Sequence, residues 1–138
     1  MRRGMVLAMS VAMLLTIPAV ANAAPRTLGD YVGTWESIDI DGSNQELTIT
    51  DNGDGTLNFV LVDDGGSFCG EFDPAGNPTV PLTATGTGTI ARNGKVTVAS
   101  FNIVCDNGVA GPSIPVTFKV KPHSRMKDST GVIWTLTP

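Results

Sequence analysis

The residues best suited to chemistry lie in the acidic stretch DIDGSNQELTITDNGDGTLNF, residues 39–59. Aspartates spaced among glycines are typical of calcium loops, in which fixed positions supply oxygen ligands, the sixth is glycine and the twelfth is glutamate. A loop beginning at Asp39 would place Asn44 sixth and Thr50 twelfth. A loop beginning at Asp51 would place Thr56 sixth and Val62 twelfth. Both frames fail, so we predict two hairpin turns and no metal site, with a non-standard carboxylate site as the alternative.

Other catalytic patterns are equally incomplete. The only histidine, His123, has no partner base nearby in the sequence, and we predict that it lies in a solvated loop. In GGSFC, residues 65–69, Cys69 stands where a nucleophile elbow needs glycine. Carboxylates could still converge from separate strands, and the nearest candidates are Asp63, Asp64 and Glu71. We predict no catalytic residue and no cofactor, and keep a carboxylate-based hydrolase as a third hypothesis.

Charge is unevenly distributed along the chain. Residues 27–91 contain eleven acids and no Lys or Arg, whereas Arg92 is followed by five more Lys or Arg and two acids. Removal of Arg2 and Arg3 with a leader would change the formal net charge from −4 to −6, so nucleic acid and anionic membrane are not expected partners. The asymmetry indicates either attraction between two parts of the folded chain or an acidic surface that docks on a basic partner. The alternating cations are predicted to form a solvated face interrupted by a turn at Pro122, with an anion site as the alternative: Lys119, Lys121, His123, Arg125 and Lys127.

The N-terminus has the pattern of a secretory signal peptide. Two arginines precede an apolar run, and Ala21-Asn22-Ala23 forms a small-x-small cleavage site. We predict a signal peptide over residues 1–23, a single mature domain over 24–138, no membrane association after cleavage, and a secreted, periplasmic or extracellular location. In such a compartment Cys69 and Cys105 are expected to form a disulfide worth about 3–4 kcal/mol, rather than a reactive or metal-binding pair.

The elements that must position these residues are strands. Short alternating or apolar segments are separated by Gly, Pro, Asn and Asp, and no segment has a sustained helical period. We predict an all-β antiparallel meander closed as a small barrel, with a β-sandwich as the alternative. The eight predicted strands are Thr34–Ile40, Gln45–Thr50, Thr56–Val62, Ser67–Phe72, Val80–Ala91, Lys95–Cys105, Ile114–Lys121 and Thr130–Thr137.

Two hairpins can be predicted in register. Asn93-Gly94 suits a two-residue turn, which places Gly88 opposite Ala99 and Gly86 opposite Phe101. An earlier hairpin is predicted to pair Ile49 with Leu57 and Leu47 with Phe59. Gly86 and Gly88 then fall on the inner face, where either Phe101 covers the bare backbone or a ligand occupies the space.

LGDYVGTWES, residues 28–37, resembles the opening of calycin barrels, the superfamily of lipocalins, fatty-acid-binding proteins and avidins. The resemblance rests on Gly33, Thr34 and Trp35, and implies a barrel whose tryptophan closes one end. Lipocalins place an arginine against that tryptophan, whereas the last predicted strand, GVIWTLTP, has none. Several calycin-like proteins are secreted bacterial protease inhibitors, and the small size, leader and single cysteine pair are similar.

These observations favour an exported binding module over an enzyme. The first hypothesis is capture of a small apolar ligand inside the barrel by Trp35, Phe59, Phe101 and the space at Gly86 and Gly88. The second is an interaction or inhibitory module that contacts an extracellular protein through residues 24–32 or through the acidic loops.

Overall fold

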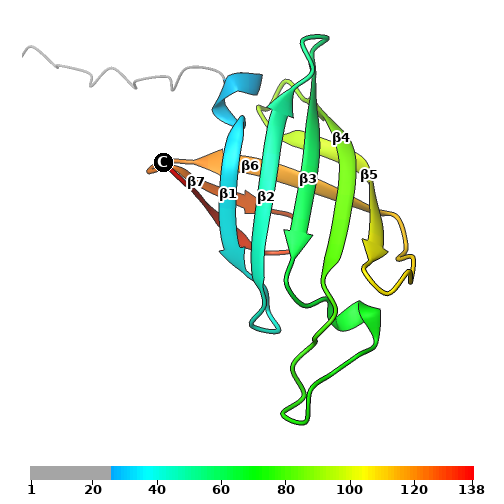
Figure 1. Ribbon diagram of the computed structural model, residues 1–138. Coiled ribbons are helices and arrows are strands. Elements are labelled where there is room, and N and C mark those ends of the chain that lie inside the picture. Colours follow the sequence, from blue (N-terminus) through cyan, green and yellow to red (C-terminus); the bar gives the residue numbers. More distant parts are fainter. Residues whose placement is uncertain (1–25) are drawn as a thin grey trace, which may run out of the picture.

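The computed structural model describes residues 26–138 and shows an up-and-down antiparallel barrel (Figure 1). The predicted signal peptide, residues 1–23, lies outside the described residues. Each strand pairs with its sequence neighbours, and β8 pairs with β1 to close the ring. The strands are β1 Gly33–Ile38, β2 Asn44–Asp51, β3 Thr56–Asp63, β4 Leu82–Ile90, β5 Val96–Cys105, β6 Ile114–Lys121, β7 Arg125–Asp128 and β8 Ile133–Leu136. Two short 3-10 helices, η1 Leu28–Asp30 and η2 Ser67–Cys69, complete the elements. The predicted barrel is confirmed over the sandwich.

The predicted strand count is correct, but one strand was misplaced. Residues 67–72 do not form a strand: they begin with η2, and Gly70 ends it in the left-handed conformation with φ 84°. Glycines on both sides of Ser67–Cys69 favour this turn over an extended chain. The missing strand is β7, whose four residues alternate exposed and buried. Residues 64–81 instead make a long loop that projects from the lower end of the barrel (Figure 1).

The β2–β3 turn confirms that the opening aspartates shape turns. The Asn52 N–H donates to Thr56 O at 3.0 Å, and Gly53 and Gly55 have positive φ angles. Asp51 and Asp54 each accept a backbone N–H two residues further on, at 2.8 and 3.0 Å. This loop shifts the predicted pairing by two residues. Such a slip keeps every side chain on its predicted face.

The predicted β2–β3 partners were wrong for that reason: Ile49 pairs with Phe59, and Leu47 pairs with Leu61. The β4–β5 register was correct only in its lower half, where Leu82 pairs with Cys105 and Ala84 with Ile103. Near the turn, the Ala91 N–H donates to Lys95 O at 2.8 Å, so the loop has three residues rather than two.

The longer β4–β5 loop changes the partners of both strand glycines. Gly88 pairs with Val98, and an irregularity between Thr85 and Gly88 removes the predicted pairing of Gly86 with Phe101. The β-bulge absorbs the one-residue mismatch between the loop and the lower half of the hairpin. Val96 and Val98 of β5 consequently turn inward.

Apolar side chains fill the inside of the barrel. The Phe59 ring centroid lies 5.1 Å from that of Phe118 and 6.0 Å from that of Phe101, which makes one aromatic cluster. The largest side chains with less than 2% of their surface exposed are Trp35, Tyr31, Phe59, Leu47, Ile49, Leu57, Met126, Val96 and Val98. Among residues 26–138, no helix is long and apolar enough to cross a membrane.

Candidate functional site

Side chains of the protein lie close to both strand glycines of the predicted interior site. A Cβ atom added at Gly88 would lie 2.6 Å from Phe59 Cε2 and 2.7 Å from Val96 Cγ1. At Gly86 it would lie 2.5 Å from Val98 Cγ1. The glycines therefore accommodate neighbouring side chains, and Phe59 with the β5 valines supplies the cover predicted for Phe101.

Trp35 and Phe101 are also core residues. The Trp35 side chain is buried, and its Nε1 donates to Tyr31 O at 2.8 Å. The Tyr31 hydroxyl in turn donates to Gly94 O at 2.6 Å, so the segment before β1 is tied to the β4–β5 turn. Burial raises the pKa of the Tyr31 hydroxyl above its ordinary value. The structure thus brings Phe59, Phe101 and Gly88 together and places Trp35 in the next row of the barrel wall, opposite Leu47.

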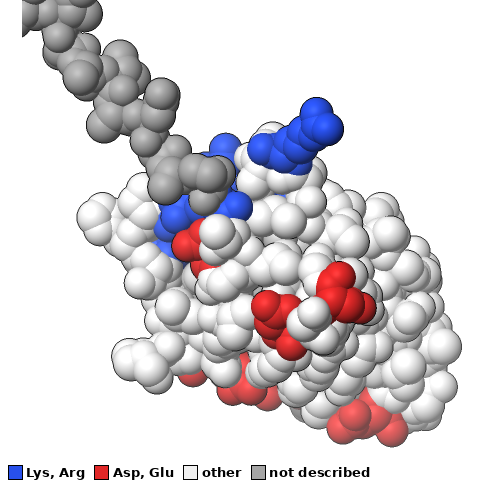
Figure 2. All heavy atoms as spheres, turned by 90° about the horizontal axis from the view of Figure 1, so that it is seen from above, with Lys and Arg blue, Asp and Glu red and all other residues white. Residues whose placement is uncertain are grey.

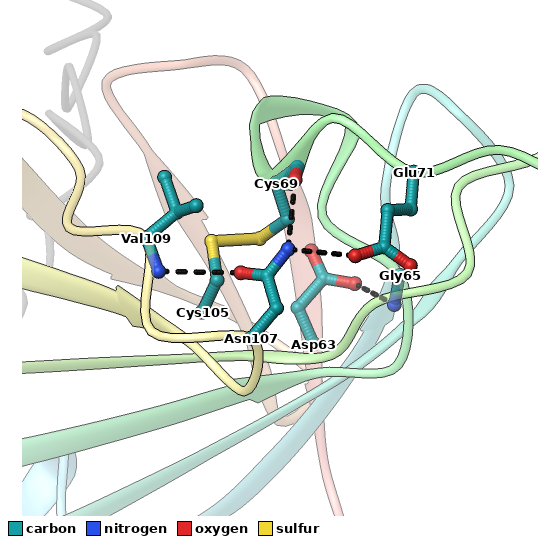
Figure 3. The surroundings of a disulfide bond; sticks show 7 residues. All are labelled: Asp63, Gly65, Cys69, Glu71, Cys105, Asn107 and Val109. Carbon is teal, nitrogen blue, oxygen red and sulfur yellow. Dashed lines mark hydrogen bonds between the residues drawn. A yellow bond between two sulfur atoms is a disulfide. The ribbon is translucent and has the colours of Figure 1, made fainter.

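The three candidate carboxylates have separate hydrogen-bond partners, and Figure 3 shows those of Asp63 and Glu71. Asp63 Oδ1 accepts the Gly65 N–H at 3.0 Å, and Glu71 Oε1 accepts Asn107 Nδ2 at 3.0 Å. Asp64 is exposed and accepts Asn44 Nδ2 at 3.4 Å. Within residues 26–138, no group of three His, Cys, Asp or Glu side chains is arranged to hold a metal ion.

A row of polar side chains crosses the inner wall at the lower mouth, which we define as the barrel end that carries residues 39–43, 64–81, 106–113 and 129–132. The ladder aligns Ser37 with Gln45 and Gln45 with Asp63 across β1, β2 and β3. Gln45 and Asp63 are both buried, and Gln45 Nε2 donates to Asp63 Oδ2 at 2.9 Å. The apolar core therefore ends in hydrogen-bonded side chains at this mouth.

Gln45 carries an unmet hydrogen-bonding group. Its Oε1 atom is the one buried side-chain oxygen or nitrogen without a partner among the described residues, and only 8% of the side-chain surface is exposed. A buried acceptor without a donor costs about 1–3 kcal/mol.

Gln45 also lines a groove of about 1260 Å³ beside the lower mouth. Four apolar side chains on this groove face solvent: Ile40 is 100% exposed, Ile38 is 68% exposed, and Val62 and Ile133 are each about two-fifths exposed. Exposed apolar side chains gathered in one groove are a starting point for a binding hypothesis. We call this feature the mouth groove; its walls come from β1, β2, β3 and the β7–β8 hairpin.

The charged lining of the mouth groove is entirely acidic. The charged residues that line it are Glu36, Asp39, Glu46 and Asp64, and the lining contains no Lys, Arg or His. Burial raises the pKa of the Asp39 carboxyl above its ordinary value, and the neighbouring carboxylates of Asp41, Asp63 and Asp128 raise it further. The groove therefore favours cationic groups, which would relieve this repulsion.

The barrel seam opens into the mouth groove. The β1–β8 ladder has two residue pairs, Trp35 with Leu136 and Glu36 with Thr135, whereas the β1–β2 ladder continues to Ile38. Below those two pairs, Ser37 Oγ donates to Ile133 O at 2.8 Å in place of a backbone bond. The edge of β1 at Ile38 is thus unpaired toward β8 and lies in the groove wall.

The predicted Cys69–Cys105 disulfide is confirmed (Figure 3). It ties the β3–β4 loop to the end of β5. Asn107 reinforces this link, because its Nδ2 donates to Cys69 O at 3.2 Å.

A second, shallow hollow of about 390 Å³ lies on the outside of the barrel, where Gly86 lines it together with mainly polar residues.

Sequence reasoning missed the mouth groove. Its apolar residues are distant in the chain, and the only local signal is the alternation of Ile38 and Ile40 with Asp39 and Asp41. A scan against protein-family models and searches of curated proteins and of solved structures found no match to this chain.

Proposed function

We propose that the protein is an exported binding module that holds an extended segment of a protein partner, both basic and apolar, in the mouth groove. One observation carries the proposal: exposed isoleucines and an all-acidic lining occur in one groove. The leader pattern of residues 1–23 and the disulfide support export. The closed eight-strand barrel and Gly33-Thr34-Trp35 support a calycin-like fold.

Each part of the groove suits one part of such a segment. Ile38, Ile40 and Ile133 would bury apolar side chains of the partner, and burial is worth about 25 cal/mol per Å² of apolar surface. The carboxylates would pair with Lys or Arg. The unpaired edge of β1 would accept backbone hydrogen bonds, as in strand addition to a sheet.

The packed interior supplies no support for capture of a small apolar ligand. Side chains of Phe59, Val96 and Val98 occupy the space above Gly86 and Gly88. Ligand capture inside the barrel therefore stays a prediction from sequence. The dispersed hydrogen bonds of Asp63, Asp64 and Glu71 likewise supply no support for a hydrolase.

The proposal is tested by titrating mature protein with a peptide that alternates Lys and Ile, and with a matched peptide in which Glu replaces Lys. Calorimetry should show binding of the Lys peptide alone. Asp64→Lys should weaken this binding at least fivefold. Asp106→Lys makes the same charge change outside the groove lining and should alter affinity less than twofold.

Equal weakening by Asp64→Lys and Asp106→Lys would show that only overall charge matters, and would contradict a role for the groove. Ile38→Ser provides a second readout, because it removes an exposed apolar side chain without changing charge. Its binding should weaken while its unfolding midpoint stays close to that of the wild type. Undiminished affinity in Ile38→Ser would contradict the apolar part of the proposal.

A further inference from the structure

The described cations and the acidic lining of the mouth groove lie on different elements of the barrel. The seven described Lys and Arg residues lie on the segment before β1, the β4–β5 turn and the β6–β7 hairpin, whose turn is at the upper end: Arg26, Arg92, Lys95, Lys119, Lys121, Arg125 and Lys127. On the β7 side of this hairpin, Lys127 pairs with Ile133 of the groove wall. Figure 2 looks onto the upper end and shows Lys and Arg gathered toward one side, with most visible Asp and Glu toward the other. The lower mouth carries the acidic groove.

The β6–β7 hairpin concentrates positive charge more than its folding requires. Lys119 pairs directly with Lys127, and Lys121 pairs directly with Arg125. All four side chains are exposed on the outer face. Like charges directly opposite each other destabilise a sheet, so this arrangement costs stability in the isolated molecule. The predicted interruption at Pro122 is thus the turn that brings the cations together.

The tip of this hairpin is also held in an unfavourable backbone conformation. His123 and Ser124 have φ angles of 63° and 53°, and they are the only non-glycine residues with positive φ in the described chain. Glycine would occupy both positions without steric cost. Pairs of like charges that lead to such a tip give a basic hairpin whose charge complements that of the acidic groove.

We infer that the protein associates head to tail, with the β6–β7 hairpin of one copy docked in the mouth groove of a second copy. This inference rests on the proposed function of the groove and names its partner. Both complementary surfaces belong to one chain, so they are present together wherever the protein is. The net negative charge opposes other orientations, whereas salt screening beyond about 8 Å leaves only facing patches to interact strongly. Because the two surfaces differ, the contact repeats along a chain of copies.

Sedimentation velocity of the mature protein tests this directly. The wild type should form species larger than a monomer at about 0.02 M salt and dissociate at about 0.5 M salt. Two neutralised variants, Lys119→Gln/Lys121→Gln on β6 and Glu46→Gln/Asp64→Asn in the groove, should each remain monomeric alone. A mixture of the two retains one intact hairpin and one intact groove, so it should form a one-to-one dimer that does not extend.

Three results would overturn the inference: a monomeric wild type at low salt, association that survives Glu46→Gln/Asp64→Asn, or a mixture that remains monomeric. A monomeric wild type that still binds the Lys-Ile peptide would overturn self-association alone and leave the proposed function intact. An acidic protein or polymer that binds the wild type but not Lys119→Gln/Lys121→Gln, while the wild type stays monomeric, would assign the hairpin to another partner.

Discussion

Gln45 Nε2 donates to Asp63 Oδ2 at 2.9 Å across β2 and β3, and the other end of the same amide, Gln45 Oε1, has no partner. The pair lies where the apolar core ends and the mouth groove begins. One end of the amide thus supports the barrel, and the other end is a buried acceptor without a partner among the described residues.

The hydrogen bond predicts an asymmetry between two substitutions. Gln45→Met preserves approximate volume but leaves buried Asp63 Oδ2 without this donor, so it should lower the free energy of unfolding by about 1–3 kcal/mol. Asp63→Asn should cost less, because the Gln45 amide can reverse and accept from the new donor while Asn Oδ1 still accepts the Gly65 N–H. Urea denaturation measures both. Equal stability of Gln45→Met and wild type would contradict the assigned bond.

Packing around Gly88 predicts that even one methyl group is harmful. Gly88→Ala would place a Cβ 2.6 Å from Phe59 Cε2, and overpacking of this kind costs about 1–3 kcal/mol. Gly29→Ala is the matched control, since its nearest neighbour would be Thr27 Oγ1 at 3.7 Å. Thermal unfolding should show a clear loss for Gly88→Ala and little change for Gly29→Ala. A Gly88→Ala protein as stable as wild type would indicate unfilled space inside the barrel.

The disulfide should stabilise the fold mainly by restricting the unfolded chain. Its cysteines are separated by 36 residues, and closing a loop of this length is worth about 3–4 kcal/mol. Cys69→Ala/Cys105→Ala should lose that amount in denaturant titrations. Asn107→Ala removes the neighbouring hydrogen bonds and keeps the bridge, so its loss should be nearer about 1 kcal/mol. A larger loss for Asn107→Ala than for the cysteine variant would reverse this ranking.

The raised pKa of Asp39 predicts a pH effect of defined sign. The folded state holds the Asp39 proton more tightly than the unfolded state, so ionised Asp39 destabilises the fold at pH values above its folded-state pKa. This loss of stability declines as the pH falls from the folded-state pKa toward the unfolded-state pKa. Asp39→Asn should therefore be more stable than wild type near neutral pH and lose that advantage in acid. Hydrogen bonds from Thr56 lower the pKa of Asp54, so Asp54→Asn should show the opposite sign. A parallel response of both variants would exclude this account.

Much of the fold could be predicted from local sequence. Alternating side chains and short Asp-, Asn- and Gly-containing turns specify antiparallel strands, and a two-residue register error leaves β2 and β3 facing the correct way. Residues 67–72 could not be placed so simply, because their path depends on glycines and on a disulfide to distant Cys105. The β4–β5 error arose because loop length and bulge position are set jointly by the closed barrel.

The candidate site was harder to predict than the fold. Gly86 and Gly88 correctly indicate close approach to the backbone, yet only the bulge decides that Phe59, Val96 and Val98 make that approach. The mouth groove combines Ile38 and Ile40 with residues 130–133, which meet because β8 closes against β1. The orphaned acceptor on Gln45 depends on side-chain geometry that no local pattern encodes.

We propose that binding occurs at the mouth groove and not inside the barrel. The most direct test is an amide chemical-shift titration of Lys119→Gln/Lys121→Gln, which should remain monomeric, with the Lys-Ile peptide. We predict shifts at residues 38–46 and 130–133, with Phe59, Gly88 and Phe101 nearly unchanged. Shifts concentrated at Phe59, Gly88 and Phe101 would contradict the account and place the binding site inside the barrel.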